Sequence, residues 1–350
     1  MEHQPAAMPF ARAGAPHLPP RRRVSDLMFR VIWALLPAIA AHAWFFGWGI
    51  VVQVVLACLF GLILEWVMLR LRARPAQPFL SDGSVLTTAL LFALCLPPLA
   101  PWWVNATGML FAVVVAKHLY GGLGFNLFNP AMVGLAVVII TFPIELSQWL
   151  APRGLGEGLP GLIETVRAIA TGHVSNGPAW DAISAATPLD QLRTGLQSQF
   201  LVSEIRADPV FGALVARGWE WVALASLAGG LWLAWQRVIS WHAPTALLVT
   251  TLIISTPPWL LAPDLHYSPL QQLLSGGLML AAFFIITDPV SGSATPRGKI
   301  IFGAGVALIT LAIRRYGGFP DGVAFAVLLM NMLVPLIDRY TRPRVYGHPR

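Results

Sequence analysis

The sequence predicts an all-α polytopic membrane protein, and three observations support this prediction. Apolar residues make up 56% of the 350 residues and charged residues only 11%, whereas soluble domains carry about 25% charged residues. The apolar residues gather in long runs separated by short polar links, which is the pattern of membrane helices. The net charge of +7 lies beside these runs, where basic residues orient helices, so the charge gives no reason to expect nucleic-acid binding.

The apolar runs divide the chain into ten expected spans. A helix needs about 20 apolar residues to cross a bilayer, and fewer where it is broken or thins the membrane. The expected spans are residues 27–45, 49–69, 84–99, 102–117, 128–143, 219–236, 243–261, 270–287, 300–313 and 322–337. The resulting regions are an N-terminal tail (1–26), a first membrane half (27–143), a long polar loop (144–218), a second membrane half (219–338) and a C-terminal tail (339–350).

Lysine and arginine in the short links predict the orientation of the spans. If the N-terminus is cytoplasmic, the inner segments hold fifteen of these residues and the short outer links hold only Arg314 and Arg315. Because basic residues accumulate on the cytoplasmic side, both termini are expected there. The loop at 144–218 carries five arginines, but a loop of that length is translocated largely regardless of its charge. The loop is therefore expected on the outer face.

A short internal echo accompanies this topology. The pentapeptide LYGGL at 119–123 follows the fourth span, and RYGGF at 315–319 follows the ninth. The predicted topology puts the first on the inside and the second on the outside. Two five-helix halves of inverted orientation would give this arrangement, with a functional site near the midplane where helices are broken.

The outer loop contains the polar stretch DAISAATPLDQLRTG at 181–195. Thr187 is typical of a helix N-cap, with Pro188 at the first helical position and Asp190 in the first turn. A helix N-terminus presents unpaired amides and a partial positive charge, so it would also hold a phosphate. Arg193 would add a charge-assisted hydrogen bond if the helix turns it toward the cap, whereas Asp190 would repel a phosphate.

Two segments on the expected inner side are further candidates. Asp82, in Asp-Gly-Ser at the mouth of the third span, marks either an ion or cofactor site or a solvated helix cap. Residues 117–132, KHLYGGLGFNLFNPAM, cannot form a plain helix at membrane depth because four of them are glycine or proline. Broken backbone there leaves Asn126 and Asn129 free to bind a flat polar ligand or an ion, or forms a purely structural re-entrant turn.

Other polar residues compete with these candidates or are expected in water. Thr295 lies in TDPVSGSATPR (287–297), which repeats the Ser-x-Ala-Thr-Pro theme, but the topology puts Thr295 in a cytoplasmic link. His42, Glu65 and Asp321 fall near predicted helix ends, where solvated positions are expected for polar side chains.

With these motifs in view, the chain resembles the D component of the Rnf electron-transport complex (Rsx in some bacteria). It is more distantly similar to the B component of the sodium-pumping NADH:quinone oxidoreductase. The resemblance covers essentially all the spans. It is carried by the stretches FLSDGSVLTTALLFALCLPP, VVAKHLYGGLGFNLFNPAMVG and RRYGGFPDGVAFAVLLMNMLVPLID, and by the TDP after the eighth span.

The resemblance implies a covalent flavin. In this family the last threonine of a Ser-Gly-Ala-Thr or Ser-Thr-Ala-Thr motif in the outer loop carries FMN through a phosphoester bond. Ser184-Ala185-Ala186-Thr187 occupies that place here. Ala185 stands where glycine or threonine is usual, and since glycine provides backbone freedom, this departure concerns the loop geometry or the fit of the attaching transferase.

A second flavin is implied as well, because relatives in the sodium pump also bind riboflavin within the membrane domain. We assign Asp82, Asn126 and Asn129 to that second flavin or to the ion path.

The implied function is that of a flavin-carrying subunit in a complex that couples electron transfer from ferredoxin or NADH to ion translocation. The implied partners are Rnf subunits A, B, C, E and G, a flavin transferase and the bilayer of the bacterial inner membrane, with the flavin loop on the periplasmic face. The chain alone is not a complete enzyme, since its two cysteines, Cys58 and Cys95, are too few for a four-thiolate iron–sulfur site. The alternative is a non-redox channel or an inverted-repeat secondary transporter, because the fold alone does not decide function.

Overall fold

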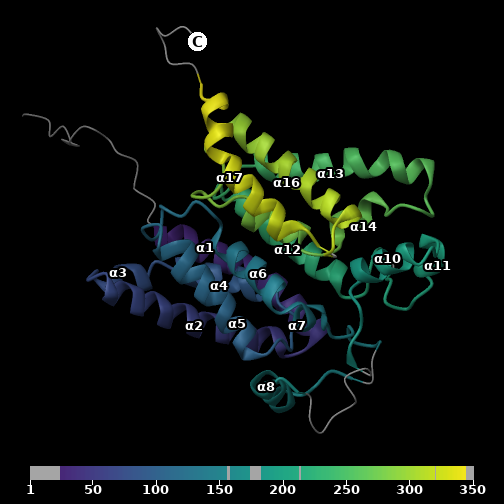
Figure 1. The fold of residues 1–350 in the computed structure, drawn as a ribbon, viewed down its shortest axis with the longest axis horizontal. Helices are drawn as coiled ribbons and strands as arrows, with labels where there is room; N and C mark the ends of the chain where they lie inside the picture. Colours follow the sequence, from purple (N-terminus) through teal and green to yellow (C-terminus); the bar gives the residue numbers. More distant parts are fainter. Residues whose placement is uncertain (1–23, 156–157, 174–182, 213, 320, 344–350) are drawn as a thin grey trace, which may run out of the picture.

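Two groups of membrane helices and a connecting segment make up the computed structural model, which describes residues 24–155, 158–173, 183–212, 214–319 and 321–343 (Figure 1). The described part is helical, with one isolated β-bridge and no strand. The first group contains α1 (Val24–Phe46), α2 (Gly49–Leu71), α3 (Ala76–Leu80), α4 (Ser84–Ala93), α5 (Trp102–Leu110), the π-helical η1 (Phe111–His118) and α6 (Pro130–Thr141).

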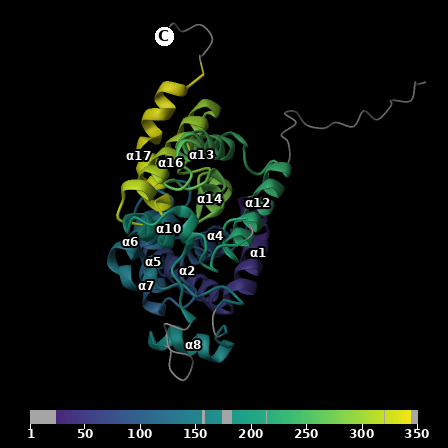
Figure 2. The ribbon, with the colours of Figure 1, turned by 90° about the vertical axis from the view of Figure 1, so that its right-hand side faces the viewer.

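The second group follows a connecting segment that carries only short helices (Figure 2). The connecting segment contains α7 (Pro143–Ser147), α8 (Leu162–Thr171), α10 (Pro188–Gln197) and α11 (Val202–Ile205). The second group contains α12 (Trp219–Trp235), α13 (His242–Leu261), α14 (Pro269–Leu274), α15 (Leu278–Leu280), the π-helical η2 (Ala281–Ile285), α16 (Pro296–Tyr316) and α17 (Val323–Thr341).

Five of the described helices, α1, α2, α13, α16 and α17, are long and apolar enough to cross a membrane. The prediction of an all-α multi-pass protein is confirmed at this level. The other expected spans are shorter or interrupted: the helix within 84–99 ends at Ala93, and 270–287 is divided among α14, α15 and η2. Ten spans, and the side on which each terminus lies, therefore stay predictions. The expected tails fall mostly at residues 1–23 and 344–350, outside the described part of the chain.

Several of the long helices contain proline. Pro37 lies inside α1, Pro257 and Pro258 inside α13, and Pro335 inside α17. Proline removes an amide donor and would break many soluble helices, but neighbouring helices and hydroxyl side chains satisfy the freed carbonyls within a membrane. These prolines therefore fit helices that cross a bilayer.

Corresponding helices of the two groups make corresponding contacts. In the first group α2 packs against α5 and η1, and in the second α13 packs against α16. The last helix of each group, α6 or α17, packs on the helix before it in its own group, α5 or α16. The two groups meet where α6 packs on α17 and where α1 packs along α12. Two halves related by a pseudo-two-fold axis would give this pattern, and the inverted repeat stays a prediction.

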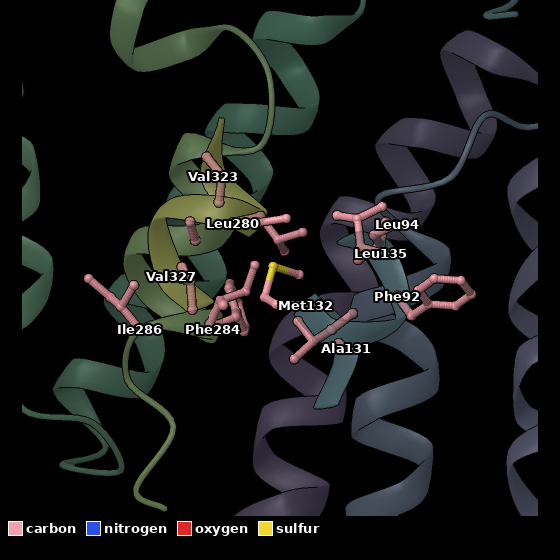
Figure 3. Close-up of a cluster of buried hydrophobic side chains, with 14 of the residues drawn as sticks. Phe92, Leu94, Ala131, Met132, Leu135, Leu280, Phe284, Ile286, Val323 and Val327 are labelled. Atoms are coloured by element: carbon pink, nitrogen blue, oxygen red, sulfur yellow. The ribbon is translucent and has the colours of Figure 1, made fainter. Parts of the chain in front are cut away.

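Apolar side chains gather between the two halves (Figure 3). Ala131, Met132 and Leu135 on α6 face Leu280, at the end of α15, and Phe284 on η2. Phe92 is also fully buried, and a Cβ added at Gly108 of α5 would meet its ring, so glycine is needed there for α4 and α5 to approach closely. The core therefore fixes how one half sits against the other.

Exposed tryptophans lie at both ends of the α1–α12 pair. Trp44 and Trp48 lie around the end of α1 and Trp221 at the start of α12, while Trp235 and Trp241 lie at the other end of α12 and beyond it. Tryptophan is enriched where membrane helices meet the headgroup region, because its ring is both apolar and polar. The distribution supports α12 as a spanning helix, although it has only 17 residues.

Candidate functional site

A cavity of about 400 Å³ lies between the two membrane halves. Its apolar walls include Leu94, Met132, Leu135, Leu280 and Val323, which Figure 3 shows facing one another across the interface. The volume falls within the range of roughly 300–1,000 Å³ that is typical of small-molecule sites. Polar and charged side chains, among them Arg193 and Asp321, complete the lining.

Thr187 lies in the wall of this cavity, at the N-terminus of α10. Its Oγ1 accepts a hydrogen bond from the Asp190 amide at 3.2 Å, and Pro188 occupies the first helical position. The helix start expected from the sequence is therefore confirmed. Thr187 is half-buried and Ala186 exposed, so Thr187 lies at a boundary between solvent and cavity.

The segment before Thr187 is held by backbone hydrogen bonds. The amide of Ala185 donates to the carbonyl of Trp149 (3.0 Å), and the amide of Ala151 donates to the carbonyl of Ile183 (2.8 Å). Ser184 forms the isolated bridge with Leu150. Ala185 has an ordinary negative φ, since it is not among the residues with positive φ in the described chain. The alanine thus adopts this backbone without strain.

Helix α10 connects the loop to the second half. Leu189 packs beside Gly276, which has φ +64 and would clash with it if a Cβ were added. Arg193 donates from Nη1 to the carbonyl of Gly318 at 2.7 Å and also lines the cavity. The expected contact of Arg193 with the cap is replaced by this bond, which joins α10 to the RYGGF pentapeptide at 315–319.

A buried arginine organises the polar rim on the same side. Arg314 is 2% exposed and lies against Asp321, with Nη2 3.2 Å from Oδ1. It also donates to the carbonyls of Gln272 (2.7 Å) and Ser275 (3.0 Å), while the other oxygen of Asp321 accepts from the Gly277 amide (2.7 Å). Asp321 was expected in water, but its side chain is only 29% exposed and is paired.

His42 was also expected in a solvated position, and this expectation is wrong. The side chain is 1% exposed and lies in the cavity wall. Trp219 of α12 lies edge-on to its ring with centroids 6.3 Å apart, and Phe46 is tilted against it at 4.9 Å. The end of α1 is covered because α12 and the segment around Trp149 pack over it, and Trp149 lies 4.8 Å from Trp219.

A second polar cluster lies in the first half, away from this cavity. Lys117 of η1 donates from Nζ to both carboxylate oxygens of Glu65 on α2 (2.9 Å each) and to the hydroxyl of Ser84 (3.0 Å). His118 Nε2 lies 3.0 Å from Glu65. The expectation of a solvated Glu65 is therefore wrong, since this residue is 1% exposed. Asp82, the residue singled out from the sequence, accepts from the Ser84 amide (2.7 Å) at the edge of this cluster.

With both sites described, comparison with known proteins decides the family. The model of the NQR2, RnfD, RnfE family matches residues 11–347. The chain belongs to this family. It is 49% identical to the D component of the ion-translocating oxidoreductase complex of Escherichia coli O127:H6 (strain E2348/69), over 97% of this chain and 99% of that protein. The proteins of the same name from Escherichia coli O1:K1 and strain SE11 are 49% and 48% identical, with the same coverage.

Of the two asparagines singled out from the sequence, Asn129 lies at the contact of α6 with the second half, and Asn126 lies in the broken segment before it. Asn129 caps α6 by accepting from the Met132 amide (3.2 Å), and its backbone amide donates to Asn331 Oδ1 (3.1 Å). Asn126 donates to the carbonyl of Phe128 (3.1 Å). The break in the helix is confirmed, with glycines 121, 122 and 124 at positive φ. These asparagines do not line the cavity at Thr187.

Thr295, the rival of Thr187 in local sequence, also caps a helix. Its Oγ1 accepts from the Gly298 amide (2.9 Å) and lies 2.5 Å from the hydroxyl of Thr341. The local geometry of the two threonines is alike, because the same Thr-Pro signal produces both caps. Their surroundings differ, since Thr187 borders the cavity and Thr295 does not.

Proposed function

We propose that this chain is the flavin-carrying membrane subunit of an ion-translocating electron-transport complex, with FMN bound to Thr187 through a phosphoester. The observation that carries the proposal is the position of Thr187, in the wall of a largely apolar cavity at a helix N-terminus. Near-full-length similarity to proteins named as components of an ion-translocating oxidoreductase complex supports the assignment to such a complex.

The residues around Thr187 fit a phosphate and a flat ring. The first amides of α10 and its partial positive charge favour an anion at the cap, which is opposed by Asp190 in the same turn. The cavity walls accept the ring and exclude water. Trp149 and Trp219 offer aromatic surface for stacking. The flavin would supply the electron transfer, while the chain supplies position, electrostatics and a dry site.

Thr187 acts as an anchor in this proposal. Its hydroxyl is consumed once, when a separate flavin transferase forms the ester, and takes no part in turnover. The proposed assembly joins the chain to Rnf subunits A, B, C, E and G in the inner membrane, with ten spans, both termini cytoplasmic and the loop at 144–218 on the periplasmic face. The excess of lysine and arginine in the proposed inner links supports this orientation.

A second flavin, such as riboflavin, or the ion path is proposed to involve Asp82, Asn126 and Asn129. Asp82 lies at the edge of the Lys117–Glu65 cluster, which adds buried charge, and the two asparagines lie on the broken backbone after η1. Ionisable residues within the membrane mark ion or proton routes because their burial is otherwise costly.

The test of the proposed function is in-gel fluorescence. The full chain is expressed together with its flavin transferase, denatured and run on a gel under ultraviolet light. A yellow-green band should migrate with the wild type and with Thr295→Ala, and it should vanish in Thr187→Ala. A dark wild type that still transports an ion in the absence of other subunits would instead support a non-redox channel or transporter.

A further inference from the structure

We propose that His42 binds the polar edge of the ring system tethered at Thr187 and sets its midpoint potential. The inference rests on the proposed function. His42 and Thr187 line the same cavity but come from α1 and α10, and the rest of the first membrane half lies between these helices in the sequence. The juxtaposition results from the packing of α12 along α1 and of the connecting segment over both.

The hydrogen-bonding state of His42 indicates a missing partner. The side chain is 1% exposed, and within the described residues neither Nδ1 nor Nε2 has a hydrogen-bond partner. Buried polar groups are nearly always bonded, because an unsatisfied donor or acceptor keeps its full desolvation cost. A ring with both nitrogens unused, in the wall of a ligand-sized cavity, is therefore prepared for a polar group that enters the cavity.

Two serine hydroxyls of this wall already have protein partners. Ser226, which is buried, donates to the carbonyl of Val222 (2.9 Å), and Ser147, which is exposed, donates to the carbonyl of Ile144 (2.7 Å). Arg193 and Asp321, nearer the rim, have the protein partners described above. Among the described residues that line the cavity, His42 is thus the one whose fully buried side-chain nitrogens have no hydrogen-bond partner.

The aromatic neighbours hold the His42 imidazole in place. Phe46 and Trp219 pack on the imidazole, and Trp149 extends the same aromatic wall. A flat heteroaromatic ring against Trp149 and Trp219 would present its edge, rather than its face, to one of the His42 nitrogens. The chemical class that fits is a fused ring whose edge alternates carbonyl and N–H groups, since a neutral imidazole offers one donor and one acceptor.

The consequence for redox chemistry follows from charge. Reduction increases the electron density on the carbonyl edge of such a ring, so a donated hydrogen bond becomes stronger in the reduced form. His42 therefore stabilises the reduced ring over the oxidised ring and raises the midpoint potential. A hydrogen bond of ordinary net strength changes an equilibrium constant about tenfold, which corresponds to ~30 mV for a two-electron couple.

The experiment uses the full chain with its attached flavin and measures the midpoint potential by visible absorbance. His42→Phe should keep the fluorescent gel band and lower the potential by ~30 mV. His42→Gln, which keeps a donor, should lie closer to the wild type. The matched control is His242→Phe. His242 also has a buried nitrogen without a hydrogen-bond partner and stacks on Trp241, but it does not line the cavity. The midpoint potential of the flavin in His242→Phe should therefore equal that of the wild type.

The outcomes separate this inference from the proposed function. Normal flavin attachment in His42→Phe with an unchanged potential would overturn the role of His42 and leave the anchor at Thr187 intact. If His42→Phe does not fold, His42→Leu replaces it, and equal potentials for leucine, glutamine and histidine overturn the inference. A freely diffusing ring is tested by adding riboflavin to the Thr187→Ala chain. If binding there depends on His42 while the tethered flavin is insensitive to it, the proposal is also overturned.

Discussion

Lys117 and Glu65 form a buried ion pair inside the first membrane half, with Nζ 2.9 Å from both carboxylate oxygens. The two side chains are 4% and 1% exposed, so water contributes almost nothing to their solvation. The pair joins η1 to α2, and the hydroxyl of Ser84 brings in the start of α4. Three helices of the first half are therefore held by one charged cluster.

Breaking this pair should destabilise the protein strongly. Glu65→Gln leaves Lys117 buried without its counter-charge, and we expect a loss of about 3–5 kcal/mol in the free energy of unfolding. Thermal unfolding in detergent measures this loss. The matched control is Glu164→Gln at an exposed position of α8, where glutamine keeps the bond to the Gly161 amide. The double replacement of Glu65 and Lys117 by leucine should be less harmful than Glu65→Gln, and a more harmful double variant would contradict this explanation.

Thr187→Asn should separate the structural role of Thr187 from its proposed chemical role. Asparagine is a favoured N-cap and can accept from the Asp190 amide as threonine does. We therefore expect stability near that of the wild type, whereas Thr187→Ala should lose about 1 kcal/mol. Both variants should lack the fluorescent flavin band. A band that persists in Thr187→Asn would show that the flavin is attached elsewhere.

Local signals predicted the cap at Thr187, because an N-cap depends on only four consecutive residues. The long helices were also predictable, since each is a continuous apolar run. The interruption of 270–287 was missed: Ser275, Gly276 and Gly277 separate α14 from α15, and Gly276 takes a positive φ. Glycine in an apolar run is compatible with a helix, so only the packing of Leu189 and Asp321 around this turn reveals the break.

The polar contacts of the sites required tertiary structure. Glu65 and Lys117 are 52 residues apart and meet because α2 packs on η1. His42 is buried because Trp219, far along the chain, covers the end of α1. The expectation that polar residues near helix ends are solvated takes no account of segments that cover those ends. It was therefore wrong for both His42 and Glu65. A histidine inside an apolar helix was the only sequence signal available.

Tyr267 should make the protein sensitive to alkali. Burial raises its pKa from the ordinary 10.0 to about 12, partly offset by nearby Arg314, Arg315 and Arg193. Between these values the folded state keeps the phenol proton and the unfolded state loses it, so stability falls as pH rises from 10.0 toward 12. Two pKa units correspond to ~3 kcal/mol.

Tyr267→Phe should therefore flatten the decline of thermal stability at alkaline pH, measured as unfolding temperature in detergent buffers. Tyr316→Phe is the matched control because Tyr316 is 86% exposed. The unfolding temperature of this variant should decline with alkaline pH as that of the wild type does. If the Tyr267→Phe profile were as steep as that of the wild type, Tyr267 would not be the group responsible.

The proposed topology places two exposed alanines on opposite sides of the membrane, and single cysteines there should report it. Ala186 precedes Thr187 in the outer loop and Ala294 precedes Thr295 in a proposed inner link. In a chain with Cys58 and Cys95 replaced by alanine, a membrane-impermeant maleimide on intact spheroplasts should label Ala186→Cys. Ala294→Cys should react only after the membrane is disrupted. The physical reason is the excess of lysine and arginine in the proposed inner links, which favours the cytoplasmic side. Labelling of Ala294→Cys alone in intact spheroplasts would reverse the orientation and put Thr187, with its cavity, on the cytoplasmic face.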